Sequence, residues 1–216
     1  MKSIDQLKRQ QSGFTIVELM IAMAVLSVVL LVVTLAMLNI GNLYNKGINQ
    51  AKVQNAARSL SDELGSHLQL MSQGTSPVPN VVGQVHVEGQ NVDVSVACMG
   101  DTRYTFVIGV QQGSNSTAEQ PQIPHVLWRD KCEGPTPNLA ASVPSSNGTE
   151  LVPNRARLTQ FEVSGTGVYN VKVGIAYGDN DLLTDPPSGA NVRCKSGANT
   201  KFCATAYLNT KVASRL

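Results

Sequence analysis

The chain has 216 residues, a formal net charge of +2, and only 15% charged and 5% aromatic residues. So small a net charge argues against a protein that coats nucleic acid and against a long disordered tail. The length leaves room for one ordinary globular domain plus an additional segment.

The first element is an apolar segment close to the N-terminus. Leu19 through Leu38 carry no charge, proline or glycine, and a helix of that length covers about 30 Å, the thickness of the bilayer hydrocarbon. Lys8 and Arg9 precede this segment. The positive-inside rule therefore predicts a cytoplasmic N-terminus and export of everything after about residue 40.

A cleaved secretory signal peptide fits this segment less well. The cleavage site of a signal peptide follows its apolar region, whereas here the small pair Ser12 and Gly13 precedes it. The apolar run is also longer than the usual length of about 7–15 residues. A cut is therefore expected before the hydrophobic segment, which would stay on the mature protein.

The residues at this junction resemble a known processing signal. The stretch GFTIVELM, residues 13–20, is similar to the class III signal of type IV pilins and type II secretion pseudopilins, and the resemblance covers about residues 8–40. It implies a leader peptide of residues 1–13 that a prepilin peptidase removes by cutting after Gly13. It also implies methylation of the new amino terminus at Phe14.

Glu18 is an acid at the start of this apolar segment. A carboxylate in lipid is costly unless it is paired or neutral, so Glu18 is either functional or placed at the interface, where water reaches it. Cleavage would create a cationic α-amino group on Phe14, close to Glu18 along the helix. The resemblance implies that Glu18 of an incoming subunit pairs with the Phe14 amine of an assembled one, which makes Glu18 an assembly residue.

The helix is predicted to continue past the membrane as a soluble half, residues 41–74. Apolar residues recur there in steps of three and four, which predicts one face that packs on a domain. They are Ile40, Tyr44, Ile48, Ala51, Val53, Ala57, Leu60, Leu64, Leu68 and Met71. Gly74 followed by Pro77 is expected to end the helix.

After Asn80 the hydrophobic period changes to two, which indicates strands. We expect strands at residues 81–88, 92–98, 103–110, 125–129, 155–163, 168–177 and 204–212, and loops at 111–124, 133–153 and 178–203. The predicted fold class is α+β. A long N-terminal helix, with a transmembrane or filament-core half at 14–40, packs on a mainly antiparallel β-sheet domain at 75–216.

Four cysteines fall in the part of the chain expected outside the membrane, where disulfides persist. They are Cys98, Cys132, Cys194 and Cys203. Four cysteines permit three pairings; Cys98 with Cys132 and Cys194 with Cys203 would close loops worth roughly 3–4 kcal/mol each. Zinc is disfavoured because no C-x-x-C pair or histidine at metal spacing accompanies them.

A weak calcium candidate lies in the loop before these last cysteines. Asp179, Asp181 and Asp185 gather carboxylate oxygens, the ligands that calcium prefers. The loop lacks the glycine and the closing glutamate of an EF-hand, so a solvated turn is the preferred interpretation.

The C-terminal region is basic. Lys195, Lys201 and Lys211, interleaved with Phe202 and Tyr207, could contact DNA, since cations hold phosphate and aromatic rings stack on bases. Lysines also keep sheet edges soluble, and this second interpretation is preferred. Nucleic acid is therefore a conceivable partner that the sequence does not favour.

No catalytic motif is present, and the sequence indicates neither an enzyme nor a cofactor. The resemblance implies a structural subunit, a minor pilin of a type IV pilus similar to the PilW type or to J-type pseudopilins. Its implied partners are other pilin subunits, the prepilin peptidase and the inner-membrane assembly platform. The chain would lie in the inner or cytoplasmic membrane before assembly and at the cell surface afterwards. The alternatives are a type II secretion pseudopilin, or a single-span anchored adhesin or DNA-binding surface receptor.

Overall fold

The computed structural model describes residues 13–71, 77, 79–87, 90–113, 122–132, 148–184, 186, 188–197 and 200–215. The chain divides into two compact units between Leu43 and Tyr44. The first unit contains the beginning of helix α1 (Ile16–Gln69), and the second contains the rest of α1 and the β-strands.

In the first unit, the side chains of α1 are exposed from Ile16 through Leu43. Its two polar hydroxyls bond to carbonyls of their own helix: Ser27 Oγ donates to Met23 O and Thr34 Oγ1 to Leu30 O, both at 2.8 Å. Polar side chains satisfied in this way are compatible with an apolar environment. Among the described residues, α1 is a helix long and apolar enough to cross a membrane.

In the second unit, α1 buries one face. Val53, Ala57, Leu60, Leu64 and Leu68 are at most 3% exposed and recur in steps of three and four, as predicted. The predicted start of this face was wrong, because Tyr44 and Ala51 are exposed. The helix ends at Gln69, before the expected stop, and residues 72–76 lie outside the described part of the chain.

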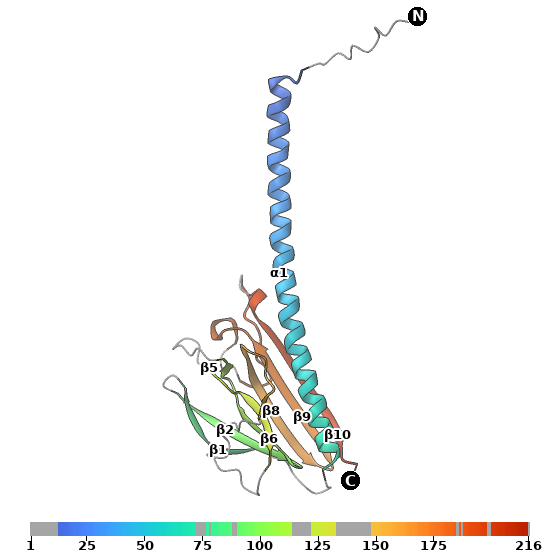
Figure 1. Ribbon diagram of the computed structural model, residues 1–216, viewed down its shortest axis with the longest axis vertical. Helices are drawn as coiled ribbons and strands as arrows, with labels where there is room; N and C mark the ends of the chain where they lie inside the picture. Colours follow the sequence, from blue (N-terminus) through green and yellow to red (C-terminus); the bar gives the residue numbers. More distant parts are fainter. Residues whose placement is uncertain are drawn as a thin grey trace, which may run out of the picture. The chain divides into compact units, whose positions relative to one another are not determined.

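The strands form two sheets of five (Figure 1). Sheet A has the order β1 (Asn80–Val87), β2 (Gln90–Met99), β3 (Thr102–Val107), β6 (Leu127–Lys131), β7 (Thr149–Glu150). Sheet B has the order β10 (Ala204–Ala213), β9 (Val168–Tyr177), β8 (Ala156–Thr166), β4 (Gln111–Gln112), β5 (Gln122–Ile123). Within the described part of the chain, the strand pairings are antiparallel except that of β4 with β5.

Glycines form the tight hairpin between β8 and β9. Gly165 and Gly167 have φ angles of 109° and 72°, which residues with a side chain rarely adopt. A Cβ on Gly165 would also lie 2.3 Å from Val168 O. The hairpin therefore requires glycine at position 165 for both conformation and space.

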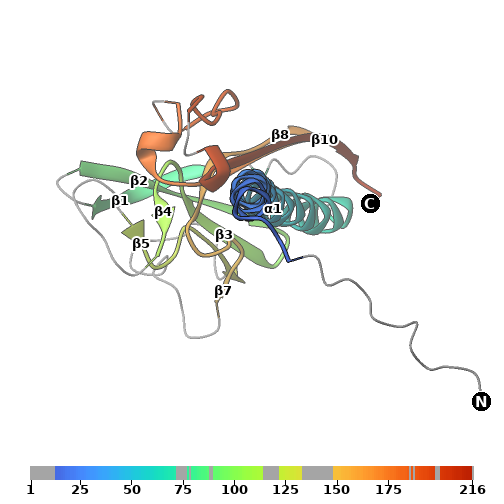
Figure 2. The ribbon, with the colours of Figure 1, turned by 90° about the horizontal axis from the view of Figure 1, so that it is seen from above.

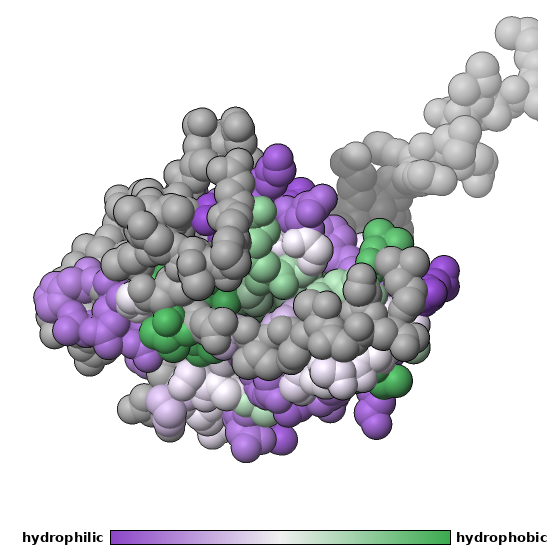
Figure 3. All heavy atoms as spheres, turned by 90° about the horizontal axis from the view of Figure 1, so that it is seen from below, coloured by the Kyte–Doolittle hydropathy of each residue, from purple (hydrophilic) through white to green (hydrophobic). Residues whose placement is uncertain are grey.

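The core lies between the two sheets, and α1 covers its open side. Phe106 of β3 and Phe161 of β8 meet at 4.5 Å between ring centroids. Figure 2 shows the second half of α1 with β8 and β10 on one side and β3 and β7 on the other. Ser61 Oγ lies 3.1 Å from Thr210 Oγ1 of β10, so the helix contacts the edge strand of sheet B directly. On the face drawn in Figure 3, the described surface is mostly hydrophilic, with hydrophobic residues in separate patches.

The α+β fold class is confirmed, with a long N-terminal helix and mainly antiparallel strands. The prediction of a single sheet was wrong, because the described strands form two sheets. The short strands β4 and β5 occupy the predicted loop 111–124, and β7 occupies the predicted loop 133–153. Each of these strands has two residues, which is too short to show the alternation of apolar and polar residues from which strands are predicted.

Candidate functional site

The predicted processing site lies just before α1. Gly13, Phe14 and Thr15 are outside the helix, and Phe14 is 84% exposed. The peptide bond between Gly13 and Phe14 is therefore accessible and free of helical hydrogen bonds. Residues 1–12 of the predicted leader lie outside the described part of the chain.

Thr15 and Glu18 form a capping box at the start of α1. The Thr15 amide and hydroxyl both donate to Glu18 Oε2, at 2.9 and 3.0 Å. The Glu18 amide donates in return to Thr15 Oγ1 at 3.3 Å. These reciprocal bonds satisfy amides that the first turn of a helix leaves without a partner. Glu18 thus orders the helix start in the uncut chain.

Sequence reasoning missed the contribution of Thr15. Its signal was visible, because a threonine followed three residues later by glutamate, directly before an apolar run, is the capping-box pattern. Glu18 was interpreted as half of an ion pair or as a residue at the membrane interface. The structure gives the same carboxylate a hydrogen-bonding role within its own chain.

A second polar cluster joins α1 to sheet A. Tyr104 is fully buried and donates its hydroxyl to Glu63 Oε1 at 2.9 Å, and the same hydroxyl lies 3.1 Å from His67 Nδ1. Arg129 Nη1 lies 3.0 Å from Glu63 Oε1. Burial, and then the charge of Glu63, raises the pKa of Tyr104. The cluster holds the helix against β3 and β6.

The cysteines form two disulfides, Cys98 with Cys132 and Cys194 with Cys203. The first joins the end of β2 to the residue after β6, across the end of β3. The second closes a short loop over the outer face of sheet B. Beneath that loop, Leu183 and Val192 pack with Ala176 in a small buried cluster.

The predicted calcium residues are only partly described. Asp179 Oδ1 lies 3.6 Å from Arg155 Nη2, and Asp181 is exposed. Asp185 lies outside the described residues. Within the described ranges, no group of three or more histidine, cysteine or acidic side chains is placed to hold a metal ion.

Arg157 organises this loop and was not anticipated. It is 1% exposed, and its Nη2 donates to Gly178 O at 2.9 Å and its Nη1 to Gly109 O at 3.2 Å. Nη1 also donates to Asn180 Oδ1. Burial lowers the pKa of Arg157 to about 10. A buried side chain of β8 thus holds residues 178–180 in place through hydrogen bonds. No sequence pattern indicates this role.

The structure separates the lysines proposed to contact DNA. Lys201 lies beside Phe202, and Lys195 lies next to the Cys194–Cys203 disulfide. Lys211 is on β10, and seven strand residues from Ala204 span roughly 20 Å. Its neighbours Thr210 and Val212 face α1, so Lys211 points to the opposite side. The three lysines do not form one patch.

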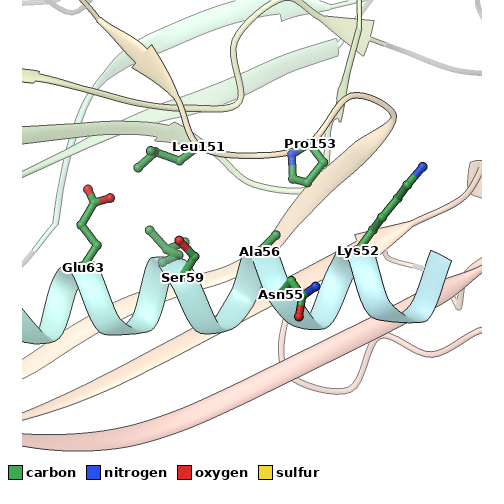
Figure 4. Close-up of a pocket in the computed structure, with 8 residues that line it drawn as sticks. Lys52, Asn55, Ala56, Ser59, Glu63, Leu151 and Pro153 are labelled. Carbon is green, nitrogen blue, oxygen red and sulfur yellow. The ribbon is translucent and has the colours of Figure 1, made fainter. Parts of the chain in front are cut away.

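A groove of about 440 Å³ runs along the part of α1 that belongs to the second unit (Figure 4). Lys52 and Glu63 lie toward its two ends, and Leu151 and Pro153 face the helix across it. Among the described residues that line the groove, Ser59 carries the only hydroxyl, and none is a histidine.

Comparisons with known proteins identify only the N-terminal segment. Residues 8–34 match the family model for the prokaryotic N-terminal methylation motif. No curated protein and no solved structure matches the chain. The motif is characteristic of structural rather than catalytic proteins, and with the apolar helix it suggests membrane anchoring before assembly. Together these findings support a type IV pilin-like or pseudopilin-like protein in general.

Proposed function

We propose that the chain is a minor pilin of a type IV pilus. Prepilin peptidase removes the leader, residues 1–13, Phe14 is methylated, and residues 14–40 then serve as a membrane anchor and later as a filament-core helix. Residues 41–74 and 75–216 form the part that lies outside. The observation that carries the proposal is the methylation motif at residues 8–34, which overlaps an exposed apolar helix directly after an accessible Gly13–Phe14 bond.

Assembly depends on the carboxylate of Glu18. In the uncut chain this group accepts hydrogen bonds from Thr15. Cleavage places a cationic amine on Phe14, one residue before Thr15. An incoming subunit can then offer its Glu18 to the Phe14 amine of an assembled neighbour. Pairing in an apolar bundle is favoured because an isolated carboxylate there is costly, and the pair sets the axial register.

Mass spectrometry of native filaments tests the processing step. We expect a chain that begins at Phe14 and carries one extra methyl group. Residues 1–13 still attached in assembled filaments would contradict the proposal.

A substitution tests the assembly step. Glu18→Ala is expected to insert into the membrane but to fail in filament incorporation, because the incoming subunit loses its anionic partner. Ser27→Ala is the matched control, since Ser27 lies in the same apolar helix and bonds only to Met23 O of its own helix in this structure. Normal incorporation of the Glu18→Ala chain would refute the mechanism.

A deletion strain separates a pilus from a secretion system. Loss of surface pili with normal protein secretion supports the minor-pilin role. Normal pili with lost secretion of exported proteins would identify a type II secretion pseudopilin instead.

A further inference from the structure

An exposed aromatic ring and a cation lie together at one end of the second unit. The short 3₁₀ helix η3 (Thr200–Phe202) leaves the Phe202 ring 47% exposed, and Lys201 Nζ lies 5.0 Å from the centre of that ring. Asn49 Nδ2 of α1 donates to Lys201 O at 3.2 Å. The pair is thus fixed beside the first turns of α1 that belong to this unit (Figure 1).

The backbone around Phe202 is held rigidly, so the exposure of the ring is built into the fold. The next residue, Cys203, is buried and bonded to Cys194. Gly178 packs closely against this segment, because a Cβ added to it would lie 3.0 Å from Phe202 O. The exposed part of the Phe202 ring is therefore held at a defined place on the surface of the unit.

Positive charge predominates around the ring. Arg193 and Lys195 flank Cys194 and are exposed, and Lys46 is exposed one helical turn before Asn49. The depression of about 320 Å³ that Phe202 lines also contains Arg155, Asp179 and Asp181. Arg155 is 3.6 Å from Asp179, so these two largely offset each other. Among the described residues, Lys46, Arg193 and Lys195 add three exposed positive charges here, and Asp181 adds one negative charge; Asp185 lies outside that part of the chain.

The chain tethers this end of the unit to the apolar segment. Tyr44, the first residue of the second unit, follows Leu38 by six positions. Even fully extended, six residues span at most about 20 Å. With the apolar segment in a bilayer, this end of the unit therefore remains close to the headgroups whatever the arrangement of the two units. Tyr44 is itself 68% exposed.

We propose that this end of the second unit docks on anionic lipid headgroups in the membrane-held precursor. The headgroup surface consists of Lys46, Arg193, Lys195, Lys201 and Phe202. The cations attract anionic headgroups, and the aromatic ring enters the interface, where amphipathic contacts of this kind are favourable. The inference rests on the membrane-anchored state in the proposed function.

Lipid fits this surface better than nucleic acid does. Single-stranded DNA is held by successive aromatic platforms along a basic groove, whereas the headgroup surface has one ring. Lys211, which would extend a basic track, lies at the far end of β10. The tether also keeps lipid at high effective concentration, while DNA would have to compete from solution.

Hydrogen exchange of the full chain tests the proposal. The chain is reconstituted in vesicles of phosphatidylcholine alone and in vesicles that also contain phosphatidylglycerol. We expect slower exchange of the peptide spanning residues 193–204 only with phosphatidylglycerol, and loss of that protection in about 1 M salt, where the Debye length falls to about 3 Å. Lys46→Glu with Arg193→Glu should abolish the protection, since each cation near an anionic surface contributes roughly a fivefold factor. Lys211→Glu is the matched control and should retain the protection.

Each outcome separates the two proposals. Equal exchange in both vesicle types, with the chain resistant to alkaline extraction, overturns the headgroup surface and leaves the pilin proposal intact. A chain that alkaline extraction removes from vesicles overturns both. Protection by a single-stranded oligonucleotide in phosphatidylcholine vesicles, without protection by phosphatidylglycerol, assigns the surface to nucleic acid and overturns the lipid proposal.

Discussion

The Tyr104 hydroxyl on β3 donates to Glu63 Oε1 on α1 at 2.9 Å, and both groups belong to residues with buried or half-buried side chains. This bond joins a helix and a strand that lie 41 residues apart in the chain. It connects the part of α1 in the second unit to sheet A, where Arg129 Nη1 also lies 3.0 Å from Glu63 Oε1. The helix is therefore attached to sheet A by polar bonds as well as by apolar packing.

Tyr104→Phe should lower the free energy of unfolding by about 1–3 kcal/mol, because the Glu63 carboxylate loses a buried donor. The full chain in detergent micelles can be unfolded with urea and followed by the fluorescence of Trp128, the single tryptophan, which is 5% exposed. Tyr177→Phe is a suitable control for the loss of a hydroxyl elsewhere on the sheets. An unchanged midpoint for Tyr104→Phe would show that the bond contributes nothing.

The same residue predicts a pH dependence. Burial and the charge of Glu63 raise the pKa of Tyr104, so the folded state favours the neutral phenol more than the unfolded chain does. The stability that this difference provides is fully present below the unfolded pKa of about 10 and is lost as the pH rises above it. Unfolding free energies of the wild-type chain should therefore decline more steeply above about pH 10 than those of Tyr104→Phe. Parallel curves would contradict this assignment.

A third prediction compares two ion pairs that differ in burial. Arg103 Nε donates to Asp130 Oδ1 at 2.7 Å, and the two side chains are 7% and 4% exposed. Asp130→Asn leaves a buried guanidinium without its counter-charge and should cost about 3–5 kcal/mol. Lys172 and Glu162 form a partly exposed pair, with side chains 27% and 41% exposed, and Glu162→Gln should have a much smaller effect because water and salt screen the interaction. Equal effects in urea titrations of the two variants would refute this contrast.

The main architecture could be predicted from the sequence because its signals are periodic. The change from a helical period to a period of two near Asn80 separated α1 from the strands. The face of α1 that begins at Val53 was predicted from the same spacing. The prediction that this face also includes Tyr44 was wrong. An apolar side chain becomes buried only where a partner exists, and the sheets do not cover Tyr44.

Other features had no local signal. The division into two sheets depends on which strands pair, and β4, β5 and β7 are too short to show an alternation. Arg157 bonds to backbone carbonyls of Gly109 and Gly178, far away in the chain, so its burial could not be inferred. Thr15 is different, because its capping pattern was present in the sequence but was passed over in favour of the charge of Glu18.

The two disulfides should stabilise the second unit unequally. In the chain-entropy model, the Cys98–Cys132 bond, with a sequence separation of 34, contributes about 4 kcal/mol. The Cys194–Cys203 bond, with a separation of 9, contributes about 3 kcal/mol. Cys98→Ser with Cys132→Ser should therefore lower the urea midpoint more than Cys194→Ser with Cys203→Ser.

The loss of each disulfide should also loosen a different share of the chain. Loss of the second disulfide loosens the loop over Leu183 and Val192, which pack in a small cluster separate from the main core. Hydrogen exchange should accelerate only in residues 182–203 for that variant. Faster exchange throughout the core would show that this loop is not a local unit.

The last prediction is that the Thr15 hydroxyl stabilises the first turn of α1 in the uncut chain. Thr15→Val removes the hydroxyl that accepts from the Glu18 amide and donates to Glu18 Oε2, while the side chain keeps nearly the same volume. The first turn should fray, and the amides of residues 16–18 should exchange roughly fivefold faster, as expected for a lost N-cap. Thr15→Ser retains the hydroxyl and should keep the wild-type exchange rates. Amide exchange of the precursor in micelles, measured by nuclear magnetic resonance, distinguishes the two variants. Identical rates for Thr15→Val and the wild type would mean that the lipid-like environment, rather than the capping box, holds the helix start.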